Sequence, residues 1–236
     1  MDTIIYIILV PMVYAAFGIF ILGTAMRIMK VWRAPKHSTT LQIYPEQKPK
    51  WLWTLNDTFL FPTVRRHYPV HWVFLMLFHI CFFLLIIGHF ELIDDYRILQ
   101  IIEHEVFLGG GYVGLILSIA LLFFLFRRFR SPVRELSVPE DFYLILLLFL
   151  TVVFGSEMDW ARTWYGYGGF AVEDYRQYLS SLLYLKPDLP DAATESGHSF
   201  MLILHVFFAN LFLMFFPFSK IMHSFFSLAM NKLRRG

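Results

Sequence analysis

Long apolar runs constrain this chain more than any other feature of its sequence. They cover residues 4–26, 72–92, 106–126, 142–158 and 198–218. A helix needs about 20 apolar residues to cross the hydrocarbon core of a bilayer, and several of these runs approach that length. The composition agrees, because 58% of the residues are hydrophobic and only 16% are charged. The sequence therefore predicts an all-α integral membrane protein with five transmembrane helices, formed as a single membrane domain over residues 1–236, and excludes an ordinary soluble enzyme.

The chain has one cysteine, Cys81. An internal disulfide needs two cysteines, and a cysteine-ligated iron–sulfur cluster needs several. A covalent c-type haem is also excluded, because the sequence contains no CxxCH motif.

Basic residues concentrate on alternate connections between the runs. Sixteen of the twenty lysines and arginines lie in residues 27–71, in residues 127–140 and in the tail after the fifth run. The other two connections, 91–105 and 157–197, are mainly acidic. Cytoplasmic connections of membrane proteins carry the excess of Lys and Arg. We therefore expect an uncleaved first span with its N-terminus outside, and a cytoplasmic C-terminus.

Two long connections complete the predicted architecture. Residues 27–71 are expected to form a cytoplasmic interfacial loop, since their stretch 51–62 is too apolar for a plain linker and favours the membrane interface or a partner. Residues 157–197 are expected to form an outer loop, in which apolar residues recur at helical spacing over 174–183. That spacing predicts a short amphipathic helix on the outer surface or over a pocket.

Four histidines lie within the spans or in direct continuation of one: His79, His89, His205 and His223. Ionisable groups are costly in a membrane, so each is a functional candidate. His205 and His223 are 18 residues apart, which is five helical turns on one face, about 27 Å. His79 and His89 are separated by about 15 Å along their helix.

The second and fifth spans run in opposite directions, so His89 and His205 would form an outer pair and His79 and His223 an inner pair. Two imidazoles at one depth are what a six-coordinate b-type haem needs. The spacing therefore predicts two b haems between the second and fifth helices, with these four histidines as metal ligands. His71 is also 18 residues before His89 and is an alternative to His79 at the inner site.

The histidines also have simpler explanations. One imidazole can hydrogen-bond a neighbouring helix, and a set of them can relay protons. The chain could then be a structural membrane anchor or a small transporter without haem.

Short motifs around these histidines resemble the gamma subunit of respiratory nitrate reductase. They are Leu77-Phe78-His79 with Gly88-His89-Phe90, the corner Arg127-Arg128-Phe129-Arg130-Ser131-Pro132, and Phe216-Pro217-Phe218-Ser219-Lys220-Ile221-Met222-His223. The resemblance covers residues 75–230. It implies a five-span dihaem cytochrome b that exchanges electrons with a membrane quinone, with the four histidines paired as above.

The chain differs from that family in its longer first inner connection, and in this respect resembles the cytochrome b subunits that serve heterodisulfide-reductase-like iron–sulfur proteins. This branch implies a subunit of a quinone/quinol oxidoreductase complex in the cell membrane of a prokaryote, active in anaerobic respiration. We expect menaquinone as the quinone and a cytoplasmic iron–sulfur subunit as the partner. An outer-side cytochrome c subunit is a further candidate partner, and no nucleic acid is expected. The alternative is the gamma subunit of a nitrate reductase itself.

The resemblance also implies a quinone site on the outer side. The family uses a lysine near the start of its third span, and the nearest basic side chain here is His104. We expect His104 to contact the quinone, and Glu103 and Glu105 to accept protons, unless all three are solvated loop residues. Gly88 is expected either to let a porphyrin approach the backbone or to pack helix on helix. Lys220, Arg127 and Arg128 are candidates to pair with haem propionates, although the positive-inside bias alone explains them.

Two further groups of residues have alternative interpretations. The glycines Gly109, Gly110, Gly111 and Gly114 favour helix packing over haem clearance. The aromatic residues from Trp160 to Phe170 are typical of an interfacial belt and could also form the wall of a quinone pocket.

Overall fold

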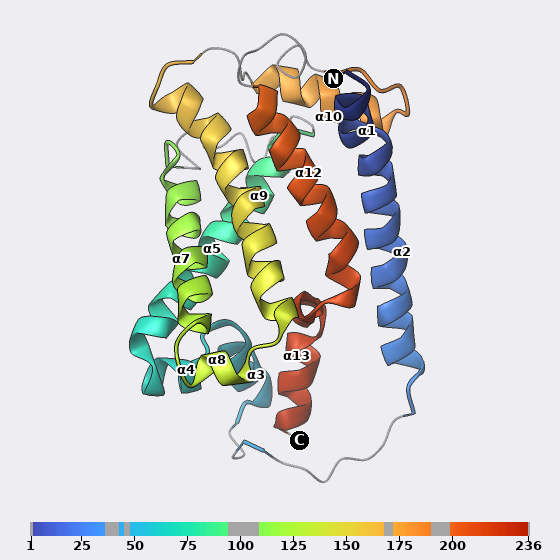
Figure 1. Cartoon of the computed structure of the whole chain (residues 1–236). Coiled ribbons are helices and arrows are strands. Elements are labelled where there is room, and N and C mark those ends of the chain that lie inside the picture. Colours follow the sequence, from blue (N-terminus) through green and yellow to red (C-terminus); the bar gives the residue numbers. More distant parts are fainter. Residues whose placement is uncertain are drawn as a thin grey trace. The chain divides into compact units, whose positions relative to one another are not determined.

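The computed structural model describes residues 2–35, 43–44, 48–93, 109–167, 172–189 and 199–235, and its regular elements in these ranges are all helices (Figure 1). The N-terminal half contains α1 (Asp2–Leu9), α2 (Pro11–Arg33), α3 (Lys50–Phe59), α4 (Pro62–His67) and α5 (Pro69–Glu91). The C-terminal half contains α7 (Tyr112–Arg128), α8 (Val133–Leu136), α9 (Pro139–Thr163), α10 (Val172–Leu183), α12 (Ser199–Phe215), the 3₁₀ turns η1 (Phe216–Phe218) and η2 (Lys220–Met222), and α13 (His223–Arg234).

Four helical segments among the described residues are long and apolar enough to cross a membrane. They are Thr3–Arg33, Pro69–Glu91, Pro139–Thr163 and Ser199–Phe218. The first continues past Pro11, because Val10 N–H and Tyr14 N–H still make helical bonds to the carbonyls of Tyr6 and Val10. Helix α7 has 17 residues and is therefore about 25 Å long, slightly less than the hydrocarbon core. The chain is thus a multi-pass helical membrane protein. That α7 also crosses the membrane, which would make five spans, remains a proposal.

The third predicted span, 106–126, includes residues 109–111, but these residues are not helical. Gly109, Gly110 and Gly111 have left-handed φ values of 62°, 56° and 88°, so α7 begins only after them. These glycines form a turn that accepts hydrogen bonds from two indoles, one in α9 and one directly after it. Trp160 donates to the Gly111 carbonyl at 2.9 Å and Trp164 to the Gly110 carbonyl at 2.8 Å.

Packing explains the glycines at this end of α7. A Cβ at Gly111 would lie 2.7 Å from Cδ1 of Trp160, and one at Gly114 would overlap the Ser156 hydroxyl. Contacts this short leave no room for a side chain. For Gly111 and Gly114, the interpretation as helix-packing residues is confirmed.

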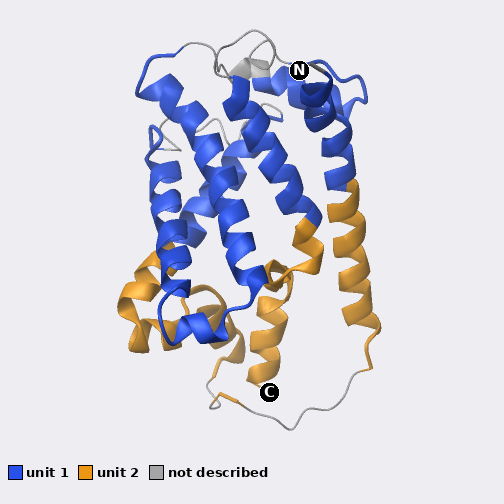
Figure 2. Cartoon of the chain, in the orientation of Figure 1, with its two compact units in different colours: residues 1–17, 77–214 blue, residues 18–76, 215–236 orange. Residues whose placement is uncertain are grey.

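The chain forms two compact units where the sequence predicted one domain (Figure 2). Unit 1 contains residues 1–17 and 77–214, and unit 2 contains residues 18–76 and 215–236. Helices α2 and α5 each contribute residues to both.

In unit 1, α9 packs between α7 and α12. Ser156 lies against Gly114 of α7, and Phe154 stacks on Phe208 of α12 with ring centroids 5.8 Å apart. The amphipathic segment predicted in the outer loop is helix α10. It packs on α1, where the buried Tyr178 hydroxyl donates to the Leu9 carbonyl. Burial raises the pKa of Tyr178, which keeps this hydroxyl a hydrogen-bond donor.

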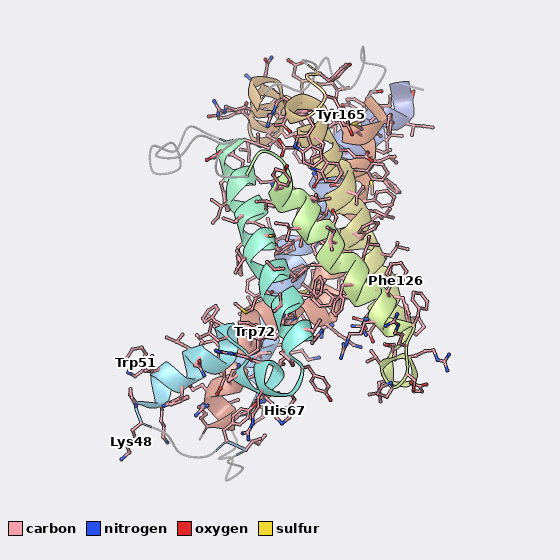
Figure 3. All side chains as sticks on the ribbon, turned by 90° about the vertical axis from the view of Figure 1, so that its left-hand side faces the viewer. Lys48, Trp51, His67, Trp72, Phe126 and Tyr165 are labelled. Atoms are coloured by element: carbon pink, nitrogen blue, oxygen red, sulfur yellow. The ribbon has the colours of Figure 1, made fainter. Side chains whose placement is uncertain are left out.

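In unit 2, α3 packs against α13 through its polar side. Asp57 of α3 pairs with the buried Arg235, and Thr58 accepts a hydrogen bond from Asn231 at 3.0 Å. The opposite side of α3 is apolar and exposed, and Figure 3 shows Trp51 pointing away from the ribbon. The Trp72 indole donates to the Leu60 carbonyl at 2.7 Å and so joins the end of α3 to the first turn of α5.

One continuous helix does not connect His205 to His223, so the prediction that both lie on one helix face is wrong. Helix α12 ends at Phe215, and two 3₁₀ turns follow. Between them Ser219 is extended, with φ −103° and ψ 171°. Pro217 lacks the N–H that a helix needs there, which explains the interruption.

Candidate functional site

The centre of the candidate site is a pair of imidazoles in unit 1. His89 lies near the end of α5 and His205 near the middle of α12. Their ring centroids are 6.0 Å apart and their planes differ by 29°. The structure thus brings together the two histidines that the spacing assigned to the outer pair.

A backbone carbonyl orients each of the two rings. His89 Nδ1 lies 2.6 Å from the Leu85 carbonyl oxygen, and His205 Nδ1 lies 2.8 Å from that of Thr151 in α9. A carbonyl can only accept, so each Nδ1 must carry the proton and each Nε2 keeps its lone pair. This tautomer is the one a metal-binding histidine uses when its other nitrogen is held by the protein.

Gly155 makes room for His205 on α9. A Cβ at Gly155 would lie 2.7 Å from Cε1 and 2.8 Å from Nδ1 of that ring. Gly155 and the Thr151 carbonyl are one helical turn apart on the same side of α9. Sequence analysis missed both residues. The only signal was a glycine inside an apolar run, which does not reveal the helix that it faces.

The distance between the rings fits a single iron held between them. A metal–imidazole nitrogen bond is about 2 Å long, and the nitrogen lies about 1 Å from its ring centroid, so two axial imidazoles have centroids about 6 Å apart. The Nδ1 bonds alone are less specific, because exposed His67 makes the same kind of bond to the Thr63 carbonyl. The observed ring spacing and the Gly155 contact therefore support a bis-histidine haem at His89 and His205.

The residues expected at the inner site belong to different units. His79 lies in the part of α5 that belongs to unit 1, and His223 is the first residue of α13 in unit 2. The alternative ligand His71 lies in the part of α5 that belongs to unit 2. His223 Nδ1 lies 3.0 Å from the Lys220 carbonyl oxygen, so a backbone carbonyl orients this ring as it does those of His89 and His205. Within unit 2, His223 also lines a pocket of about 360 Å³ together with Thr63, Ser227 and Arg234.

The remaining cofactor candidates differ in their surroundings. Gly88 is buried in α5 beside His89. Arg128 pairs with Asp141 at 3.3 Å and donates to Ser137 at 3.2 Å, which fixes the corner between α7 and α9. Arg127 is half-buried in the last turn of α7, and Lys220 is exposed. Arg128 thus has a structural role that needs no haem propionate.

The three predicted quinone-site residues, Glu103, His104 and Glu105, lie outside the described residues. Part of the aromatic group next to them is described. Trp160 and Trp164 stack with centroids 5.3 Å apart and bond to the glycine turn, so their first role is to join α9 to α7.

Comparison with known proteins agrees with the resemblance inferred from the motifs. Residues 70–236 match the family described as nitrate reductase gamma subunit. One relative is the Hdr-like menaquinol oxidoreductase cytochrome b-like subunit of Archaeoglobus fulgidus, which is 32% identical over 164 residues. That alignment covers 65% of this chain and 47% of the relative, so the chain spans about half the length of the curated relative that it matches. The chain belongs to the nitrate reductase gamma subunit family.

Proposed function

We propose that the chain is the membrane cytochrome b subunit of a quinone/quinol oxidoreductase complex of respiration in the cell membrane of a prokaryote. It carries electrons through two b haems between a quinone, menaquinone by analogy with the relative's name, and a heterodisulfide-reductase-like iron–sulfur subunit on the cytoplasmic side. The observation that carries the proposal is the His89–His205 pair, with centroids 6.0 Å apart and both Nδ1 atoms held by carbonyls.

A bis-histidine haem supplies reversible one-electron transfer without binding a further ligand. The chain's own residues hold and orient it. The Leu85 and Thr151 carbonyls fix the two imidazoles, and Gly155 allows His205 to approach α9. We assign the inner haem to His79 and His223, with His71 as the alternative to His79. Lys220 and Arg127 remain candidates for its propionates.

The quinone site belongs on the outer side in this proposal, beside His89 and His205. His104 would contact the quinone, and Glu103 and Glu105 would accept its protons. Because basic loops face the cytoplasm, the charge distribution of the loops favours an N-terminus outside and a C-terminus in the cytoplasm. Protons released outside and electrons moving inward would separate charge across the membrane.

The docking surface for the iron–sulfur partner is the cytoplasmic face of unit 2. Helix α3 turns its polar residues toward α13 and leaves Trp51, Leu52 and Phe59 exposed, each at least 49% accessible. Lys50 is the first residue of α3, and Lys48, labelled in Figure 3, lies just before it. Aromatic anchors with a basic rim suit a protein interface.

Haem content and absorption spectra test the function directly. The purified parent protein should contain two haems and show a b-type α-band after reduction with dithionite. His89→Ala and His205→Ala should each lose the same one haem, since each removes an axial ligand. His67→Ala is the matched control, because His67 makes the same carbonyl bond on an exposed helix and should keep both haems.

Absence of an α-band in the parent protein would refute the proposal and favour an anchor or a transporter. For the inner site, His79→Ala and His223→Ala should lose the second haem. If His71→Ala loses the second haem and His79→Ala keeps it, the ligand of the inner haem is His71 and not His79.

The family match favours a second candidate, the gamma subunit of a nitrate reductase. Purification of the native complex separates the two. Iron–sulfur subunits of the heterodisulfide-reductase type should co-purify in the first case, and a molybdenum enzyme in the second.

A further inference from the structure

Two arginines lie on the side of the chain where basic residues are scarce. Arg162 and Arg176 are two of only three basic residues in the acidic segment 157–197. The positive-inside bias, which explains Arg127 and Arg128, does not explain them. The third, Lys186, is exposed to solvent, whereas Arg162 and Arg176 are partly buried.

Arg162 lies on the side of α9 that faces His205. Gly155 contacts His205, and Asp159 and Arg162 follow at positions i+4 and i+7, which share one helix face. Asp159 and Arg162 form an ion pair of 2.7 Å with 19% and 20% of their side chains exposed. They therefore lie about one to two turns, or 6–10 Å, beyond Gly155 along the helix.

Arg176 is tied to the helix that carries the other imidazole. Its Nη2 donates to the Glu91 carbonyl at 3.1 Å, and Glu91 is two residues after His89. Both arginines thus lie toward the same ends of α9 and α5, beyond the His89–His205 pair and within unit 1. The propionate edge of a porphyrin between these imidazoles would face either this end of the two helices or the opposite end.

We propose that Arg162 and Arg176 form the cationic rim of the outer haem site and face its two propionate groups, with Asp159 fixing the position of Arg162. This inference rests on the proposed function. Guanidinium groups bind carboxylates through paired, charge-assisted hydrogen bonds, and Arg keeps its charge at this depth. The rim would also set the electron affinity of the site, because a nearby positive charge favours the form that has gained an electron.

Redox titration of the purified holoprotein, followed by its absorption spectrum, tests the rim. The outer haem is identified as the one that His205→Ala lacks. A unit charge about 10 Å away in a medium of intermediate dielectric changes a reduction equilibrium about tenfold, which is about 59 mV for one electron. Arg162→Gln and Arg176→Gln should each lower the potential of this haem by about that amount.

Asp159→Asn should shift the potential in the opposite direction, because it leaves the charge of Arg162 uncompensated. Arg162→Lys keeps the charge and should retain the parent potential. Lys186→Gln is the matched control, since it removes an exposed charge from the same segment, where solvent screens it.

Two results would overturn the inference. One is an unchanged potential in both Gln variants at full haem content. The other is a shift of the same sign in Asp159→Asn and Arg162→Gln, which indicates a structural role. A parent protein without haem would instead refute the proposed function itself, so the two failures are distinguishable.

Discussion

Gly155 is the residue on which the geometry of the outer site most depends. Gly155→Ala would place a Cβ 2.7 Å from Cε1 and 2.8 Å from Nδ1 of His205. The ring must then move, and its bond to the Thr151 carbonyl is disturbed. We expect the variant to lose the outer haem and fall from two haems per chain toward one, measured by haem extraction against protein concentration.

Gly18→Ala is the matched control, because a Cβ at Gly18 meets nothing within 4 Å. Alanine is the better helix former by about 1 kcal/mol, so both substitutions favour their helices by intrinsic propensity. Haem loss in Gly155→Ala alone would therefore come from the contact with His205. Full haem content in Gly155→Ala would contradict the assigned geometry.

Sequence spacing predicted which two histidines would approach each other, but not what holds them. His89 lies near the end of the second apolar run and His205 in the first part of the fifth, so two antiparallel helices bring them to one depth. The Thr151 carbonyl and Gly155 belong to a third helix, whose rotation depends on packing such as Ser156 against Gly114. A single sequence does not reveal that rotation.

At the scale of elements, α3 is held to α13 by the Asn231–Thr58 hydrogen bond and by the ion pair of Asp57 with Arg235, the residue after α13. Arg235→Ala would leave the Asp57 carboxylate unpaired, with 10% of its side chain exposed. It would also remove the guanidinium that lies over the Tyr44 and Trp53 rings, at 5.4 Å and 5.6 Å from their centroids. Breaking a buried pair from one side costs roughly 3–5 kcal/mol. We expect α3 to detach from α13 and trypsin to cut faster after Lys50, at the first residue of α3.

Arg234→Ala provides the control for this experiment. Arg234 is the exposed neighbour, and its side chain makes a weak bond of 3.4 Å to Asn231. Surface substitutions of this kind change stability by about 0.5 kcal/mol or less. Equal rates of trypsin cleavage in the two variants would show that the buried pair does not hold α3.

Hydropathy predicted the elements well where apolar runs are long and failed where backbone chemistry intervenes. The run 142–158 lies inside the longer α9, Pro139–Thr163, because Asp141 caps the helix start by accepting the Val138 N–H. The apolar run 198–218 gives no sign that the chain leaves the helix near Pro217 and Ser219. Helix α3 reverses the usual pattern, with polar side chains packed inward, so its orientation was not predictable from apolar periodicity.

At the scale of the whole molecule, whether α7 crosses the membrane decides on which side every later loop lies. Helix α7 is short, with 17 residues, and follows the glycine turn. If α7 crosses the membrane, residues 163–199 and residues 33–69 lie on opposite sides. If α7 does not cross, both connections lie on the same side. The charge distribution favours the first arrangement, because 27–71 is basic and 157–197 is acidic.

Cysteine labelling can measure this directly in whole cells. The native Cys81 is buried, with 4% of its surface exposed, and Cys81→Ser gives a background without thiols. Lys186→Cys and Lys50→Cys then place one thiol in each connection, both at exposed positions. We expect a membrane-impermeant maleimide to label Lys186→Cys in intact cells and Lys50→Cys only after the membrane is permeabilised. Labelling of both variants under the same condition would mean four spans, with residues 163–199 and α3 on one side of the membrane.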